Sequence, residues 1–173
     1  YCWGKGSNGQ LGDGGTSDRT APTPVTLPDG VTQFDAFSIG GEHSCAIGDD
    51  GNLYCWGQNN YGQLGNGSTT NALLPTLVDL PSGEAYFKDI AVGSYTSCAV
   101  GGTGTPYCWG YNLVGNVGDG PPTQRSTPTA VSLPSGVSTF TEITVGSSNV
   151  CAVGDNDTTY CWGINNYGQV GDN

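Results

Sequence analysis

Short runs of alternating hydrophobic and polar residues recur along the chain, and each run is bounded by Gly or Pro. Phe37 and Ile39 are two residues apart, so in an extended strand their side chains share one face. An equivalent pair returns as Ile90 and Val92, and again further along the chain. No stretch has the apolar spacing of a helix. The pattern therefore predicts an all-β chain of short strands joined by turns.

These strands belong to an internal repeat of 53 residues. The sequence Tyr-Cys-Trp-Gly occurs four times at equal spacing, and it divides the chain into repeats 1–53, 54–106 and 107–159 and the start of a fourth, 160–173. Glycines and prolines keep the same phase, which low-complexity sequence would not do. Such glycines mark positions of positive φ or close backbone approach. About four short strands per repeat are typical of a solenoid or of the blades of a β-propeller.

Six of the seven cysteines form three pairs, each ten residues apart. If Cys45 lies opposite Cys55 in an antiparallel hairpin, the loop 49–51 remains, with Gly51 where a three-residue turn needs a left-handed residue. The same register fits the later hairpins. We therefore predict three cross-strand disulfides, Cys45–Cys55, Cys98–Cys108 and Cys151–Cys161.

Persistent disulfides indicate an oxidising compartment, so we expect a secreted or cell-surface protein. Zinc is disfavoured, because the sequence lacks the closely spaced Cys and His sets that bind it. By the repeat, the partner of Cys2 would precede residue 1. We therefore expect the chain to be part of a longer array, with an intermolecular bond through Cys2 as the alternative.

Composition and charge narrow the function further. Fifteen acidic and four basic residues give a net charge of −11, which disfavours nucleic acid as a partner. The acidic residues are spread along the sequence, which favours a solvated surface over a charged patch. No apolar run is long enough to span a membrane. The sequence contains no nucleophile–base set, phosphate-binding loop or calcium loop, so we expect no enzyme activity, no cofactor and no metal site.

The repeat resembles the regulator-of-chromosome-condensation family over all 173 residues. The likeness rests on Tyr-Cys-Trp-Gly at 54–57, Asn-Tyr-Gly-Gln-Leu-Gly-Asn-Gly at 60–67 and Ser-Cys-Ala-Val at 97–100. It implies a β-propeller of seven four-stranded blades, of which this chain would supply about three consecutive ones. The nucleotide-exchange and chromatin role of the founding member does not carry over, because paired disulfides and an acidic chain do not suit a nucleus.

Positions that differ between repeats are released from the scaffold and can contact a partner. They gather after each Tyr-Cys-Trp-Gly and after the glycine that follows each alternating pair. Tyrosine at such positions suits protein or glycan contact. The candidate binding face comprises Tyr61, Tyr95, Tyr111, His43 and Tyr167, and ordinary variation of solvated loops is the alternative. For the lone His43 a structural role is favoured over catalysis.

The four tryptophans repeat without variation, which favours core packing or contacts between blades: Trp3, Trp56, Trp109 and Trp162. Asn66 and Asn156 stand in Asn-x-Ser/Thr sequons and offer N-glycosylation sites in a secreted protein.

The sequence therefore favours a non-enzymatic extracellular module that binds a protein or a glycan. Two alternatives stay open. One is a structural subunit of an extracellular fibre or surface assembly, completed by neighbouring copies. The other is an inhibitor of a secreted enzyme. The size of the native molecule in solution would separate a binding module from a self-completed assembly.

Overall fold

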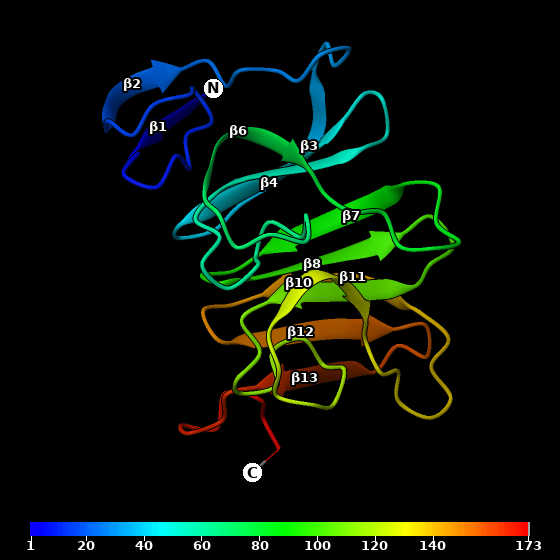
Figure 1. Ribbon diagram of the computed structural model, residues 1–173. Coiled ribbons are helices and arrows are strands. Elements are labelled where there is room, and N and C mark those ends of the chain that lie inside the picture. The colour runs from blue at the N-terminus through cyan, green and yellow to red at the C-terminus, as the bar shows by residue number, and fades with distance from the viewer. Residues whose placement is uncertain (173) are drawn as a thin grey trace.

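The computed structural model describes residues 1–172 and consists of antiparallel β-sheets that follow one another along the chain (Figure 1). Residue 173, the end of the partial repeat 160–173, lies outside the described residues. Each sheet is one blade, and its strands are hydrogen-bonded in sequence order. This arrangement confirms an all-β chain of about three four-stranded propeller blades.

The strands of each blade are as follows. The first blade has only two, β1 (Cys2–Gly4) and β2 (Arg19–Thr23). The second blade has β3 (Phe34–Ile39), β4 (His43–Gly48), β5 (Leu53–Gly57) and β6 (Ala72–Leu77). The third has β7 (Phe87–Val92), β8 (Thr96–Gly101), β9 (Pro106–Gly110) and β10 (Arg125–Ala130). The fourth has β11 (Phe140–Val145), β12 (Asn149–Gly154) and β13 (Thr159–Gly163).

The blades are out of phase with the sequence repeats. Tyr54 and Tyr107, which open two repeats, lie in β5 and β9, the third strands of their blades. A repeat therefore begins in one blade and ends in the middle of the next. Every repeat consequently supplies residues to both sides of a junction between blades.

The central hairpin of each blade has the register that the cysteine spacing predicts. Cys45 lies opposite Cys55, and both later pairs match in the same way. All three disulfides are present, as predicted. Gly51 and Gly104 have positive φ at the third loop position, and Asp157 takes that place in the last hairpin with φ of 61°. The turn chemistry and the disulfide therefore select the same pairing of strands.

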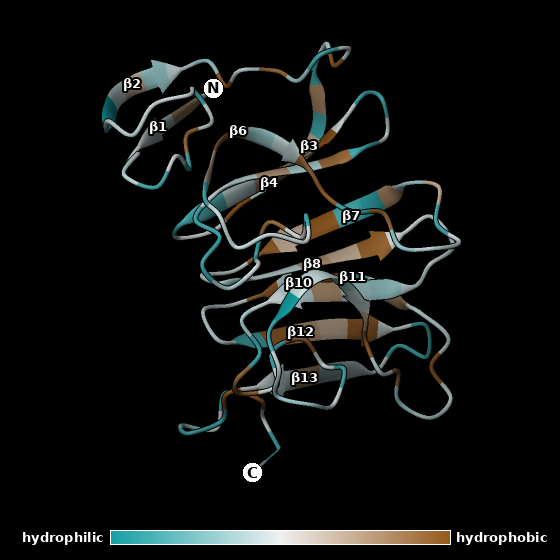
Figure 2. Cartoon of the chain, in the orientation of Figure 1, coloured by the Kyte–Doolittle hydropathy of each residue, from teal (hydrophilic) through white to brown (hydrophobic). Residues whose placement is uncertain are grey.

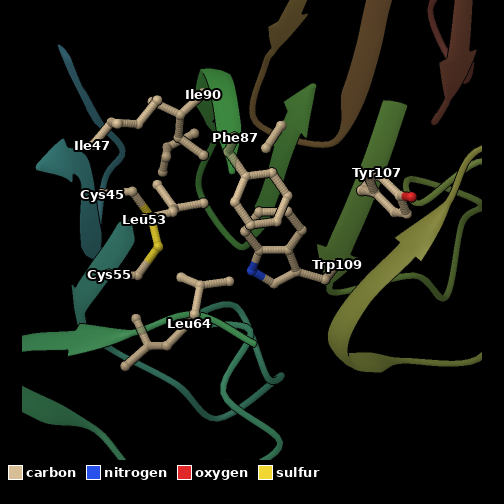
Figure 3. Close-up of a cluster of buried hydrophobic side chains, with 12 residues drawn as sticks. Cys45, Ile47, Leu53, Cys55, Leu64, Phe87, Ile90, Tyr107 and Trp109 are labelled. Carbon is tan, nitrogen blue, oxygen red and sulfur yellow. A yellow bond between two sulfur atoms is a disulfide. The ribbon is translucent and has the colours of Figure 1, made fainter. Parts of the chain in front are cut away.

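Hydrophobic residues concentrate in strands such as β8 and β12, whereas β2, β10 and most of the connecting loops are pale or hydrophilic (Figure 2). The core between the second and third blades joins Ile47, Leu53 and Leu64 to Ile90 and the neighbouring aromatic rings (Figure 3). These residues come from two consecutive blades. The hydrophobic core is therefore shared across the junction instead of lying within one sheet.

A tryptophan hydrogen bond joins each of the second, third and fourth blades to the preceding blade. The indole N–H of Trp56 donates to a backbone carbonyl 46 residues earlier in the chain, at 3.0 Å, and Trp109 and Trp162 repeat this bond at 2.9 Å. The carbonyl accepting from Trp109 belongs to Gln63, in the loop between β5 and β6. This loop thus extends beyond its own blade and packs against the next one.

Two glycines show why the repeat keeps them in phase. A Cβ on Gly65 would lie 2.6 Å from the Trp109 indole nitrogen, and its φ of +69° is left-handed. A Cβ on Gly93 would lie 2.1 Å from the carbonyl oxygen of Gly146, in the next blade. Any side chain at these positions would push neighbouring blades apart.

One prediction for the binding face is wrong. His43 lies at the start of β4 with its side chain fully buried, because the third blade covers it. Its Nε2 is 2.8 Å from the hydroxyl of Ser97, and this hydroxyl donates to the carbonyl of Gln63. Ser97 therefore accepts the His43 N–H. Burial lowers the pKa of His43 to about 3, so the ring is neutral at physiological pH.

The hairpin register leads to a first prediction. Peptide mapping of the unreduced protein should recover Cys45–Cys55, Cys98–Cys108 and Cys151–Cys161 as the linked pairs. Replacing both Cys45 and Cys55 by Ser should lower the free energy of unfolding by about 2–3 kcal/mol, because the crosslink closes a loop of ten residues. Scrambled pairs in the native protein would contradict the register.

The burial of His43 leads to a second prediction. Below pH 6.5 the unfolded chain protonates this histidine, whereas the folded chain resists protonation down to about pH 3. Stability must therefore fall as the pH drops through this window. From pH 7 to pH 5 this one group removes about 2 kcal/mol.

The matched variant is His43→Thr, since Thr96 occupies the equivalent position in the next blade. Urea unfolding at pH 7, 6 and 5 should show a shallower loss of stability for the variant than for the natural chain. The variant's lower stability at pH 7 does not affect this comparison of slopes. Parallel pH curves for the two proteins would refute the assignment.

Candidate binding face

The loops divide into two groups at opposite ends of the strands. At one end, here called the hairpin end, lie the tips of the disulfide hairpins and the connections from one blade to the next (Figure 1, right). At the other, here called the loop end, lie the long connections that follow each Tyr-Cys-Trp-Gly and the short turns 40–42, 93–95 and 146–148 (Figure 1, left). The variable positions identified in the sequence lie at the loop end.

A buried asparagine shapes each long loop. Asn59 is fully buried, its side-chain N–H groups donate to the carbonyls of Ser68 and Thr70 at 3.1 and 3.0 Å, and its oxygen accepts the N–H of Leu64 at 2.9 Å. Asn112 makes the corresponding bonds in the next loop. These asparagines stabilise the loops from inside and are not available to a ligand. Their recurrence at one repeat position was the sequence signal for this role.

Three of the predicted tyrosines meet at the junction between the second and third blades. The ring centroid of Tyr61 lies 5.3 Å from that of Tyr95 and 5.2 Å from that of Tyr111, in edge-to-face geometry. Tyr61 comes from the long loop of the second blade, whereas the other two belong to the third. Edge-to-face contact is a favourable arrangement of aromatic rings. We call Tyr61, Tyr95 and Tyr111 the tyrosine cluster.

Backbone hydrogen bonds fix the members of the cluster relative to one another. The N–H of Tyr111 donates to the carbonyl of Tyr95 at 2.9 Å, and the hydroxyl of Thr96 donates to the carbonyl of Tyr111 at 3.1 Å. The N–H of Tyr61 donates to the side-chain oxygen of Gln63 at 2.9 Å. The three tyrosines are thus set on ordered backbone, which reduces the conformational entropy that binding would cost.

The hydroxyl groups of the cluster are free for a ligand. Within residues 1–172, none of the three forms a hydrogen bond with the protein. The scaffold tyrosines differ: Tyr54 donates to Asp50 at 2.7 Å and Tyr107 to Glu84 at 3.2 Å. Partly exposed rings with unused hydroxyls suit a contact surface, because one side chain then offers both apolar area and a hydrogen bond.

The neighbouring junctions carry different chemistry at the same end of the strands. Between the first and second blades, Lys5 pairs with Glu42 at 2.8 Å, and the side-chain N–H of Asn8 donates to Glu42 at 2.7 Å. The hydrogen bond with Glu42 raises the pKa of Lys5. Between the third and fourth blades the corresponding position is Val114, beside the exposed Leu113. One scaffold thus presents a charged, an aromatic and an apolar junction in succession.

Tyr167 does not join the cluster. It occupies the repeat position of Tyr61 and is 92% exposed. The positions equivalent to Tyr95 and Tyr111, one blade further on, lie outside this sequence. His43, the remaining predicted member, is buried behind the loop end, as described above.

The two sequons differ in exposure. Asn66 is partly buried, and its side-chain oxygen accepts hydrogen bonds from the N–H and hydroxyl of Ser68 at 3.1 and 3.0 Å. Asn156 lies exposed at the tip of the last hairpin. Only Asn156 stands on an open surface.

Charge is unevenly distributed between the two ends, contrary to the even distribution expected from the sequence. The hairpin end carries one cation, Lys88, which lies close to Gly104 and Glu84, but six carboxylates, Asp29, Asp49, Asp50, Glu84, Asp155 and Asp157. At the loop end each cation is paired with a carboxylate, in Lys5–Glu42, Arg19–Asp13 and Arg125–Asp119. The tyrosine cluster therefore lies at the more nearly neutral end of the molecule.

A hollow of about 440 Å³ lies elsewhere, beside β3, and is lined by Tyr1, Phe37 and Trp56 among others. Phe37 is 73% exposed there, whereas its equivalent Ile90 is 7% exposed because it shares a core with the preceding blade. At the later junctions, strands of the preceding blade fill the equivalent space.

Residues 1–172 contain no group of His, Cys, Asp or Glu arranged to hold a metal ion. The same residues include no helix long and apolar enough to cross a membrane.

Comparison with protein families identifies the repeat. The regulator of chromosome condensation (RCC1) repeat matches residues 1–47, 50–100 and 103–153. A second description of the same repeat matches 34–63, 87–116 and 140–169. The latter ranges begin at β3, β7 and β11, the first strands of the three larger blades.

Two curated relatives match nearly the whole chain. The ultraviolet-B receptor UVR8 of Arabidopsis thaliana is 32% identical over 171 residues, which cover 99% of this chain and 38% of the receptor. The human E3 ubiquitin-protein ligase HERC2 is 31% identical over 176 residues, which cover 99% of this chain and 4% of the ligase. The chain therefore spans less than half the length of either relative.

Two solved structures share the arrangement of blades. Human WBSCR16 superposes with a TM-score of 0.81 at 25% identity, covering 98% of this chain and 44% of that protein. Prp20p of Saccharomyces cerevisiae, described with its binding to Gsp1p and histones, superposes with a TM-score of 0.75 at 26% identity, covering 98% and 42%. Both likenesses extend over all four blades.

Proposed function

Because this chain belongs to the RCC1 repeat family, we propose that it is a non-enzymatic protein-binding propeller module whose partner docks at the loop end. The observation that carries the proposal is the tyrosine cluster. Three aromatic side chains from two blades meet at positions that the repeat leaves free to vary, and their hydroxyls bind no other group among residues 1–172. In the family's expected seven-bladed propeller, this face would be part of a larger ring.

The physical character of the cluster supports a protein partner. Tyrosine is enriched in protein interfaces, because its ring buries a large apolar area while its hydroxyl makes a directed hydrogen bond. The backbone bonds between Tyr95 and Tyr111 reduce the ordering cost. Prp20p, a structural relative, is described as binding a protein and histones. A glycan is the second class of ligand that aromatic rings suit, and the experiments below separate the two.

We also infer that the module works outside the cell or at the cell surface. The three disulfides support this location, because such bonds persist in oxidising compartments and are rare in the cytosol. The net charge of −11 makes nucleic acid an unsuitable partner, since nothing neutralises its phosphates.

A triple variant tests the function. Replacement of Tyr61, Tyr95 and Tyr111 by Ala should abolish capture of the partner from the extracellular medium of the source, and should weaken binding of the purified partner at least about 30-fold. The rings lie partly exposed on an intact scaffold, so the variant should still fold. Circular dichroism and retained disulfide pairing check this.

The matched control is Tyr86→Ala, which removes an exposed tyrosine at the hairpin end. It should leave partner affinity unchanged. If the triple variant binds the purified partner as tightly as the natural protein does, the loop end is not the docking face. Binding to a glycan array that depends on the cluster would instead favour a carbohydrate ligand.

A further inference from the structure

We infer that the tyrosine cluster recognises a proline-rich peptide segment in the polyproline II conformation. The inference rests on the proposed function and adds the chemical class of the ligand. It depends on four properties of the cluster: its extent, its free donors, the engagement of most neighbouring polar groups, and local charge.

The cluster has room for about one turn of such a helix. Two centroid distances of 5.3 and 5.2 Å place Tyr95 and Tyr111 within about 10.5 Å of one another, with Tyr61 in contact with both. A polyproline II helix rises about 3.1 Å per residue and has three residues per turn, so equivalent rings recur about every 9 Å. Two prolines separated by two residues can therefore both lie on the cluster, one toward Tyr95 and the other toward Tyr111.

The free hydroxyls complement the backbone of such a ligand. A polyproline II segment forms no internal hydrogen bonds, and proline has no N–H, so the segment presents carbonyl acceptors without matching donors. Each tyrosine hydroxyl of the cluster can donate one hydrogen bond. The site therefore offers the kind of group that this backbone lacks.

The surrounding polar side chains argue against a carbohydrate, which presents many hydroxyls and needs planar amides and carboxylates as partners. Asn59 and Asn112 are buried and bonded within their own loops. The side-chain oxygen of Gln63 accepts from the Tyr61 N–H, and Glu42 is occupied by Lys5 and Asn8. Most groups that would recognise a sugar are thus already engaged, and the exposed Asn60 is the one amide beside Tyr61 that forms no side-chain hydrogen bond within residues 1–172.

Local charge and apolar surroundings favour a neutral segment. The three cations at the loop end are each neutralised by a carboxylate, whereas the hairpin end has six carboxylates and one cation, Lys88. Leu113 and Val114 follow Tyr111 in its loop and are 55% and 37% exposed. They offer contact to an aliphatic residue next to the prolines.

The test uses the full chain with its disulfides intact, labelled and applied to an array of dodecapeptides. One set carries Pro-x-x-Pro with every residue type at the intervening positions, and the matched set has Ala in place of both prolines. We expect binding to be enriched on the proline set. For the best peptide, Tyr61→Ala should weaken affinity at least about 10-fold and Tyr61→Phe about 3-fold, since the latter loses only a hydrogen bond.

Tyr86→Ala serves as the control and should bind the peptides like the natural chain. Equal binding to both peptide sets, or no binding to either, would overturn the inference, as would affinity that is indifferent to Tyr61→Ala. The proposed function fails separately. If a purified protein partner still depends on the three tyrosines while proline peptides do not bind, the docking face stands and only the ligand class is wrong.

Discussion

The hydrogen bond from a tryptophan indole to a backbone carbonyl of the preceding blade is the contact on which the rest of the structure depends. It recurs at Trp56, Trp109 and Trp162, each time 46 residues from its acceptor. The acceptor loop must reach beyond its own sheet, so glycines such as Gly65 are needed where it passes over the indole ring. Because acceptor and donor come from different blades, this bond fixes the distance and orientation between neighbouring sheets.

Because of this constraint, the geometry of the junctions repeats along the chain while the side chains that they present vary. The residues that form the junction are repeated, and they hold the ends of the loops in one arrangement whatever side chains those loops carry. Asn8, Tyr61 and Val114 therefore occupy the same place at successive junctions but present different chemistry. The tyrosine cluster is one outcome, in which residues from two blades are brought together without any change in the scaffold.

The strands, the hairpin register and the disulfides could be predicted from the sequence, because a cysteine pair and a turn residue such as Gly51 each permit only one pairing of strands. The sequence could predict which tyrosines belong to the binding face, but not that the rings of three of them pack together. Tyr61 and Tyr111 are far apart in sequence, and their meeting depends on how one blade packs on the next. The burial of His43 depends on the same packing. Carboxylates that are evenly spaced along the sequence come together at the hairpin end, because the strands that carry them there alternate in direction. The sequence alone does not show this.

Hydrogen exchange of the four indole N–H groups, followed by NMR after selective ¹⁵N labelling of tryptophan, tests the central claim most directly. Trp109 and Trp56 are buried and bonded to the preceding blade, so their indole protons should exchange most slowly. Trp162, partly exposed but bonded, should be intermediate, and Trp3, 61% exposed, should exchange fastest. Equal and rapid exchange at all four would contradict a structure in which these bonds hold the blades together.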